Sequence, residues 1–289
     1  MKIQKPNAER IQKSVNFTYI HTYNSLGLRE KEISEPLPEN TFTILALGDS
    51  YTEGVGAPGD STWPVLTERL LNDQTQDTTV DVINSGIAGS DPVFAYKLVE
   101  TFLVTYDFEM VILALNTSDI YDLFVRGGDE RFTESGEIRF RNGPKWEFFY
   151  GSSYIFRVII HDVLKYDFRF LRPHEIHKQE AKAIDLINHQ LIKFQQLANK
   201  EDFKFVIVIN PTLHEVKNNE SDLESVETYA RDSLEIPVLN LLEGFKNDSL
   251  VLEKGVDHVF WPVDFHNNSK GYTIWSKLLA EFLLKEGLN

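Results

Sequence analysis

A serine at the end of an apolar run is the first residue of this chain whose type and position suit catalysis. Residues 43–47 read Thr-Ile-Leu-Ala-Leu, which is typical of a buried strand, and Gly48, Asp49 and Ser50 follow directly. Open α/β sheets bind ligands beyond the carboxyl ends of their strands, so this turn would present Ser50 at the mouth of a parallel sheet. We interpret Ser50 as a candidate nucleophile; its alternative role is to cap a helix after the turn.

A second fragment, near the other end of the chain, contains the base that such a serine needs. Asp264 and His266 are separated by one residue. Residues two apart in an extended chain project to the same side, so Asp264 is predicted to orient the imidazole of His266. A histidine held in one tautomer by a carboxylate is the general base that activates a serine hydroxyl. The alternatives are a surface histidine for His266 and a turn or cap residue for Asp264.

These residues resemble the sequence blocks of the GDSL or SGNH hydrolase family. The first block reads Gly-Asp-Ser-Tyr-Thr-Glu-Gly over residues 48–54, and the second reads Asn-Ser-Gly-Ile-Ala-Gly over residues 84–89. The last block reads Asp-Phe-His-Asn-Asn-Ser-Lys-Gly-Tyr over residues 264–272. Most members place two residues between Asp and His where this chain has one.

The resemblance implies a role for several side chains and backbone groups. The implied catalytic triad is Ser50, His266 and Asp264. The implied backbone donors of the oxyanion hole are the N–H groups of Ser50 and Gly89. The candidate substrate-binding residues are Asp49, Tyr51 and Trp146.

The third block departs from the family pattern. Members usually read Gly-x-Asn-Asp after the third strand; aligned on Asp119, this chain has Asn116 and Ser118 at the Gly and Asn positions. The family's Asn donates its amide to the oxyanion, and losing such a donor costs about 10²–10³ in rate. Either Ser118 donates its hydroxyl, or Asn116, on the same side of an extended chain, supplies the amide. We rank Asn116 slightly ahead, and a disabled oxyanion hole is the third interpretation.

Composition and charge narrow the function classes. The chain has 289 residues, of which 42% are hydrophobic, enough for one large α/β domain or two small ones. The absence of cysteine excludes a disulfide scaffold, a thiolate nucleophile and a zinc-thiolate site. A net charge of −15 without a basic run argues against nucleic acid and anionic membranes as partners. We expect no metal and no organic cofactor.

Hydropathy predicts a chain without a membrane span. No stretch reaches the roughly 18 apolar residues of a transmembrane helix, and the first residues lack the apolar core of a signal peptide. We expect the chain as given to be soluble. The expected location is cytoplasmic, or extracytoplasmic where a signal or anchor has been trimmed.

Strand-like runs alternate with helical periodicity along the chain, which predicts an α/β fold. Strands are predicted at 42–48, 80–84, 109–115, 203–209 and 236–240. Helices are predicted at 61–73, at 92–105 with Asp91 as cap, at 178–200, after a capping box at 221–224, and from Ser269 onward. The fold class is a three-layer αβα sandwich, flavodoxin-like, with a five-stranded parallel sheet and an inserted lid-like segment.

Two segments lie outside this predicted core. Residues 1–41 form an amino-terminal extension expected to pack on the core, which spans 42–289 as an SGNH-hydrolase-like domain. An insertion at about 121–177 carries an aromatic cluster that includes Trp146. Because it leaves the carboxyl end of a central strand, we expect it to roof the site and select the substrate.

The expected function is hydrolysis of small acyl esters, of the acetyl type, through an acyl-enzyme intermediate. The expected partner is a small-molecule or carbohydrate ester. One alternative is an O-acyltransferase that moves the acyl group to a sugar hydroxyl. The other is a non-catalytic binding module with a degraded oxyanion hole.

Overall fold

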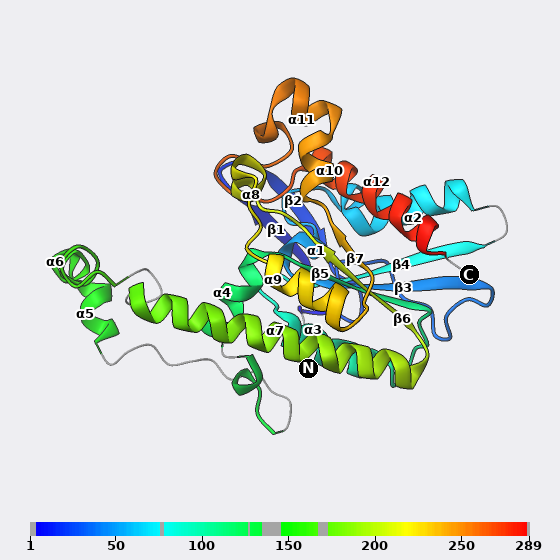
Figure 1. Ribbon diagram of the computed structural model, residues 1–289, viewed down its shortest axis with the longest axis horizontal. Helices are drawn as coiled ribbons and strands as arrows, with labels where there is room; N and C mark the ends of the chain where they lie inside the picture. Colours follow the sequence, from blue (N-terminus) through cyan, green and yellow to red (C-terminus); the bar gives the residue numbers. More distant parts are fainter. Residues whose placement is uncertain (1–3, 76–77, 127, 135–145, 167–172, 288–289) are drawn as a thin grey trace.

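A parallel sheet of five strands forms the centre of the protein, whose computed structural model describes residues 4–75, 78–126, 128–134, 146–166 and 173–287 (Figure 1). The strand order is β4-β3-β5-β6-β7. The strands are β3 (Thr41–Gly48), β4 (Thr79–Gly86), β5 (Met110–Leu115), β6 (Lys204–Ile209) and β7 (Val238–Asn240). All five predicted strands are confirmed, with ends that differ by at most two residues.

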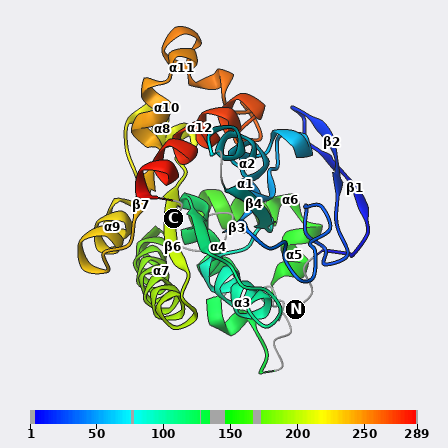
Figure 2. The same cartoon turned by 90° about the vertical axis from the view of Figure 1, so that its right-hand side faces the viewer.

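Both faces of the sheet are covered by helices because successive strand side chains point to opposite sides. Leu45 and Leu47 of β3 join one buried cluster, whereas Ile44 and Ala46 join the other. The helices on the first face are α3 (Pro92–Phe102), α7 (Pro173–Glu201) and α9 (Glu224–Thr228). Those on the second are α2 (Trp63–Gln74), α8 (Leu213–Asn218), α10 (Leu242–Asn247) and α12 (Ser269–Glu286). Figure 2 shows α2 and α12 on one side of the sheet and α3 and α7 on the other.

The remaining helices are short or belong to the insertion. They are α1 (Ser50–Glu53), α4 (Thr117–Arg126), α5 (Glu147–Ser152), α6 (Tyr154–Val158) and α11 (Ser249–Lys254). Helical turns also occur at Gly59–Ser61, Gly128–Arg131, Ile159–Val163, Tyr229–Ser233 and Val256–His258.

Helix caps follow the sequence prediction at α3 and differ from it at α9. Asp91 caps α3 by accepting a hydrogen bond from the backbone N–H of Phe94 at 3.0 Å. The capping box predicted at 221–224 is wrong, because α9 begins at Glu224 without a side-chain cap. The capping box lies instead at the start of α8, between Thr212 and Glu215.

The amino-terminal extension forms an antiparallel hairpin of β1 (Glu9–Lys13) and β2 (Thr18–Thr22). His21 of β2 is fully buried, and Tyr23 beyond it is almost so. Their side chains contact one carboxylate oxygen of Glu53, at 3.3 Å from His21 Nδ1 and 2.8 Å from Tyr23 Oη. Arg29 donates to three carbonyl groups of the core, those of Glu53, Gly54 and Ala57. The extension therefore joins the core through buried polar contacts.

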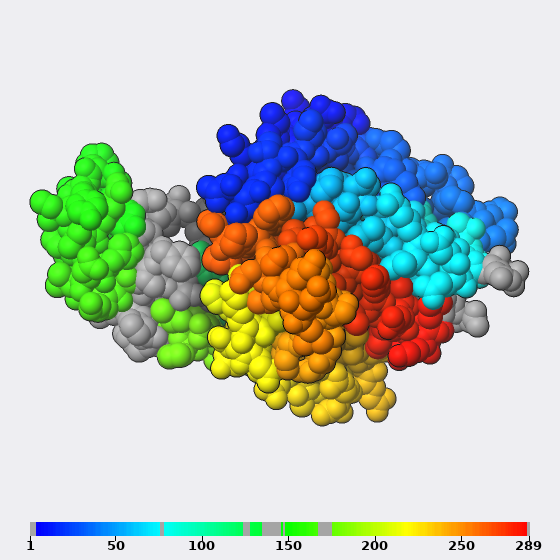
Figure 3. All heavy atoms as spheres, turned by 90° about the horizontal axis from the view of Figure 1, so that it is seen from above, coloured from blue at the N-terminus to red at the C-terminus, as the bar shows by residue number. Residues whose placement is uncertain are grey.

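The insertion begins with α4, directly after β5. Figure 1 shows α5 and α6 standing off from the sheet and its covering helices, and Figure 3 shows the same green segment as a separate lobe. Several large apolar side chains of this lobe are exposed: Phe148, Phe149, Tyr154, Ile155 and Val163.

Candidate active site

The candidate nucleophile lies at the carboxyl end of the central strand β3. The strand ends at Gly48, and α1 begins at Ser50 with Asp49 as its cap. The Asp49 carboxylate accepts the backbone N–H of Tyr51 at 2.9 Å. Asp49, and not Ser50, therefore caps the helix, and the Ser50 hydroxyl is left for another partner.

A continuous chain of hydrogen bonds links the three residues expected to form a triad. His266 Nε2 lies 2.7 Å from Ser50 Oγ, and His266 Nδ1 lies 2.6 Å from Asp264 Oδ1. In the tautomer that satisfies both contacts, Nδ1–H donates to the carboxylate and Nε2 accepts from the hydroxyl. Residues that are 216 positions apart in sequence thus meet at one point.

The backbone around the acid is a turn, so the extended chain expected between Asp264 and His266 is wrong. Phe265 has φ +66°, in the left-handed region. Its N–H donates to the carbonyl of Trp261 at 2.9 Å, and the N–H of Trp261 donates to the carbonyl of His266 at 2.9 Å. The two side chains meet because this turn folds the backbone between them.

Hydrogen bonds and the neighbouring imidazole govern the ionisation of the acid. Partial burial acts to raise the pKa of Asp264, but the hydrogen bond and charge of His266, together with a hydrogen bond from the Ser14 side chain, hold that pKa below its ordinary value. Asp264 is therefore a carboxylate at neutral pH, the form that orients an imidazole and stabilises its protonated state.

Tyr51 lies beneath the imidazole. Its ring centroid is 4.7 Å from that of His266, and its hydroxyl donates to the carbonyl of Phe265 at 3.3 Å. Burial, with the charges of Asp49, Glu215 and Asp264, raises the pKa of Tyr51. Tyr51 therefore stays a neutral donor that supports the acid turn, and its side chain is only 7% exposed.

The third block forms a network around the second carboxylate oxygen of Asp49. Asn116 Nδ2 donates to Asp49 Oδ2 at 3.1 Å, and Ser118 Oγ lies 2.8 Å from the same oxygen. Ser118 Oγ is also 2.6 Å from Asn116 Oδ1. A hydroxyl has one proton, and both of these neighbours are acceptors, whereas an amide has two. The network thus engages the only proton of Ser118 and leaves one amide hydrogen of Asn116.

Asp119, on which the third block was aligned, supports the backbone of that block. Its carboxylate accepts the N–H of Asn116 at 2.8 Å. Burial and the nearby charge of Asp49 raise the pKa of Asp119 well above its ordinary value, against the lowering effect of the Asn116 hydrogen bond.

Two backbone N–H groups near the serine have no protein partner within the described part of the chain, those of Ser50 and Gly89. Gly89 has φ +71°, which glycine adopts without strain. The loop before it is held by Glu53, whose carboxylate accepts the N–H of Ala88 at 2.7 Å. Unpaired donors beside a nucleophile suit an anion that develops on a substrate oxygen.

Trp146 lies in the aromatic lobe of the insertion. Its ring contacts those of Tyr150, Phe156 and Tyr166, with centroid distances of 6.0–6.4 Å. The structure thus brings together the expected residues of the first, second, third and last blocks, while Trp146 contacts its own lobe.

Sequence reasoning missed the residues that hold these blocks from outside. Asn16 accepts hydrogen bonds from the N–H groups of Val263 and Asp264, and Glu53 ties the second block to the extension. Asn16 lies 248 positions from Asp264, and no local pattern marks such a pair.

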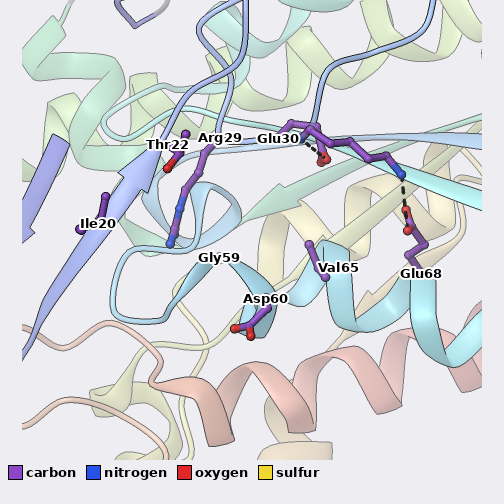
Figure 4. Close-up of a pocket in the computed structure, with 9 residues that line it drawn as sticks. Ile20, Thr22, Arg29, Glu30, Gly59, Asp60, Val65 and Glu68 are labelled. Atoms are coloured by element: carbon purple, nitrogen blue, oxygen red, sulfur yellow. Dashed lines mark hydrogen bonds and ion pairs between the residues drawn. The ribbon is translucent and has the colours of Figure 1, made fainter. Parts of the chain in front are cut away.

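A separate cavity of about 440 Å³ lies between the extension and α2 (Figure 4). It is lined by Ile20, Thr22, Arg29, Glu30, Lys31, Gly59, Asp60, Val65 and Glu68. Burial raises the pKa of Glu30 to about 7, although the N–H groups of Asn84 and Lys31 donate to its carboxylate. Lys31 is 3.6 Å from Glu68, the contact drawn as a dashed line in Figure 4. None of the triad residues lines this cavity.

Two further features concern only the residues that the structure describes. Their histidine, aspartate and glutamate side chains form no cluster able to hold a metal ion. None of their helices is both long and apolar enough to cross a membrane.

Comparison with known proteins finds similarity at the level of structure. A scan against family models and a search of curated proteins give no match. A two-domain esterase (CEX) active on acetylated mannans, co-crystallised with mannopentaose, matches with a TM-score of 0.52 and 14% identity. The match covers 85% of this chain and 49% of the esterase, so the chain spans about half the length of that protein.

Two other solved structures match over their whole length. A putative GDSL-like lipase from Parabacteroides merdae has a TM-score of 0.51 and 13% identity, covering 89% of this chain and 100% of the lipase. A putative lipolytic protein of the G-D-S-L family from Desulfitobacterium hafniense has a TM-score of 0.50 and 12% identity, covering 84% and 100%. At such identities the likeness concerns the fold, and with the five-stranded parallel sheet it shows that this chain has the fold of the GDSL or SGNH hydrolases.

Proposed function

We propose that this protein is a serine esterase that hydrolyses small acyl esters, of the acetyl type, through an acyl-enzyme intermediate. The observation that carries the proposal is the hydrogen-bonded chain from Ser50 through His266 to Asp264, with contacts of 2.7 and 2.6 Å. A serine hydroxyl needs a base in hydrogen-bond reach, and the base needs a third group that orients it. All three lie at the carboxyl edge of the sheet, where α/β folds bind ligands.

The first half of the reaction forms the acyl-enzyme. His266 Nε2 takes the proton of Ser50 as Oγ attacks the carbonyl carbon, and the carbonyl π electrons move to its oxygen. When this tetrahedral intermediate collapses, the bond to the alcohol oxygen breaks and His266 returns the proton to the leaving alcohol. Asp264 holds the imidazole and stabilises its protonated form.

The second half regenerates the enzyme. A water molecule gives its proton to His266 and attacks the acyl carbon, and collapse of the second intermediate returns the proton to Ser50 Oγ and releases the acid. In both halves the oxyanion is held by the N–H groups of Ser50 and Gly89. Asn116 is the proposed side-chain donor, because the only proton of Ser118 is engaged by Asp49 or Asn116 itself.

The proposed substrate class is an acetylated carbohydrate. It is supported by the fold shared with an esterase active on acetylated mannans, and by the aromatic side chains that the insertion carries close to the third block in sequence. Aromatic faces suit sugar rings because they present flat apolar area. Trp146 stays the candidate sugar contact, and Asp49 and Tyr51 are proposed to shape the site from beneath the nucleophile.

Hydrolysis of p-nitrophenyl acetate by the protein and its Ser50→Ala variant tests the proposal. We expect activity that falls by at least about 10³-fold in the variant, since removing a triad member leaves only the oxyanion hole and binding. A serine-directed phosphonate should add its mass to the peptide that contains Ser50. Acetate release from acetylated mannan then tests the substrate class. A protein that matches its Ser50→Ala variant on the ester and resists the phosphonate would refute an esterase and favour a binding module.

A further inference from the structure

The turn of the amino-terminal hairpin contacts the loop that carries the acid. The side-chain carbonyl oxygen of Asn16, between β1 and β2, accepts hydrogen bonds from the N–H of Val263 at 3.2 Å and the N–H of Asp264 at 3.0 Å. In Figure 3 the blue amino-terminal segment lies directly against the orange segment of the chain. One side chain of the extension thus binds two consecutive backbone groups of the acid turn.

A second residue of the same hairpin turn contacts the carboxylate itself. The Ser14 side chain is hydrogen-bonded to Asp264 and favours its charged form. The hairpin turn is closed by a bond from the N–H of Ser14 to the carbonyl of Phe17 at 2.9 Å. Ser14 and Asn16 therefore approach Asp264 from one small, closed turn.

The acid turn needs such support because its backbone is strained. A left-handed conformation at a residue other than glycine costs about 1–2 kcal/mol, and Phe265 adopts it between the acid and the base. Strain of this kind persists only where the surroundings hold the backbone in place. Within its own turn Phe265 has the bond to Trp261; the bonds to Val263 and Asp264 come from Asn16.

The hairpin is itself anchored, so it can act as a support. The ring of Phe17 lies 5.6 Å from that of Trp261, and Phe17 is 7% exposed. Further along β2, His21 and Tyr23 contact the buried carboxylate of Glu53. Burial acts to raise the pKa of Glu53, but hydrogen bonds from His21, Ala88 and Tyr23 hold it below its ordinary value. The pair of contacts fixes both ends of the strand that follows Asn16.

We propose that Asn16 is a positioning residue for the catalytic acid, so that the amino-terminal extension completes the triad from outside the sandwich. Asn16 holds the turn in which Asp264 Oδ1 meets His266 Nδ1, and Ser14 holds the carboxylate within that turn. This inference rests on the proposed function, since it assigns Asn16 a role in the same reaction.

Substitutions at the hairpin turn test the proposal through kinetics. We expect Asn16→Ala to lower kcat for p-nitrophenyl acetate by about 10- to 100-fold, the usual effect of removing a group that orients a functional side chain, with KM changed by less than about threefold. Asn16→Asp keeps an oxygen that accepts both N–H groups and should restore most of kcat. Val15→Ala is the matched control, because Val15 lies between Ser14 and Asn16 and is 80% exposed.

A readout that does not need turnover separates this inference from the proposed function. The short hydrogen bond from His266 Nδ1 to Asp264 should give a strongly deshielded proton resonance, assigned by its loss in His266→Gln. We expect the resonance in the wild type and in Val15→Ala, and its loss or broadening in Asn16→Ala. Ser14→Ala, which leaves the two backbone bonds intact, should keep the resonance and lower kcat only a few-fold; it is the second variant if Asn16→Ala does not fold.

The outcomes are distinct. If the wild type lacks esterase activity but loses the resonance on Asn16→Ala, the esterase fails and the positioning role stands. If Asn16→Ala equals Val15→Ala in both kcat and the resonance, the positioning role is refuted whether or not the protein is an esterase. If Asn16→Asp is as impaired as Asn16→Ala in both readouts, acceptance of the two N–H groups is not the cause, and the proposal is overturned.

Discussion

Alanine substitutions at Asn116 and Ser118 should have unequal effects on catalysis. Both side chains contact Asp49 Oδ2, at 3.1 and 2.8 Å, so each substitution removes one contact to that carboxylate. Asp49 also keeps its cap to the N–H of Tyr51 in both variants. The structural loss is thus similar, and the two variants differ in the number of protons that each side chain can offer a substrate.

The expected magnitudes follow from the hydrogen-bond inventory. Asn116 uses one of its two amide hydrogens on Asp49, and the other is available to an oxyanion. Removing such a donor costs about 10²–10³ in kcat, or roughly 3–4 kcal/mol of transition-state stabilisation. Ser118 has a single proton, with acceptors at 2.8 and 2.6 Å, so Ser118→Ala removes no free donor and should lower kcat by less than about tenfold.

Steady-state hydrolysis of p-nitrophenyl acetate compares the two variants, and thermal unfolding checks that both are folded. We expect KM to change little in either variant, because the oxyanion forms only in the transition state. A loss of 10²-fold or more in Ser118→Ala, with Asn116→Ala near the wild type, would refute the donor count. Unchanged kcat in both variants would show that backbone N–H groups alone form the hole.

Two further predictions concern stability. The pKa of Glu30 is raised from 4.5 to about 7, so the unfolded state loses this proton first and stability falls as pH rises between these values; Glu30→Gln should remove up to about 3 kcal/mol of that decline, measured by urea unfolding at pH 5 and 8, and parallel pH curves for the two proteins would contradict the assignment. A methyl group on Gly86 would lie 2.1 Å from the backbone nitrogen of Glu53, so Gly86→Ala should cost about 3 kcal/mol or more of unfolding free energy. Gly151→Ala, whose added methyl has no atom within 4 Å, is the control and should be neutral or slightly stabilising in the same measurement.

Local patterns were sufficient for the strands and for several helix ends. The five apolar runs became the five strands because buried parallel strands need apolar side chains on both faces. Asp91 before Pro92 predicted the start of α3, since the cap and the first turn involve only neighbouring residues. The same kind of pattern failed at 221–224, where Glu215 from the preceding helix accepts the N–H of Asp222 at 3.0 Å. A tertiary contact there replaced the local cap.

The sequence by itself determined the chemistry-bearing residues and the strand after which each one lies. Ser50, Asp264 and His266 were named from short motifs because a turn after a strand and an Asp–His pair are local features. Tertiary structure alone decided how the acid and base meet, through a left-handed Phe265 in place of an extended chain. It also decided that the only proton of Ser118 is engaged and that Asn16 holds the acid turn. These contacts join residues up to 248 positions apart, and their geometry depends on how the hairpin and sandwich pack against each other.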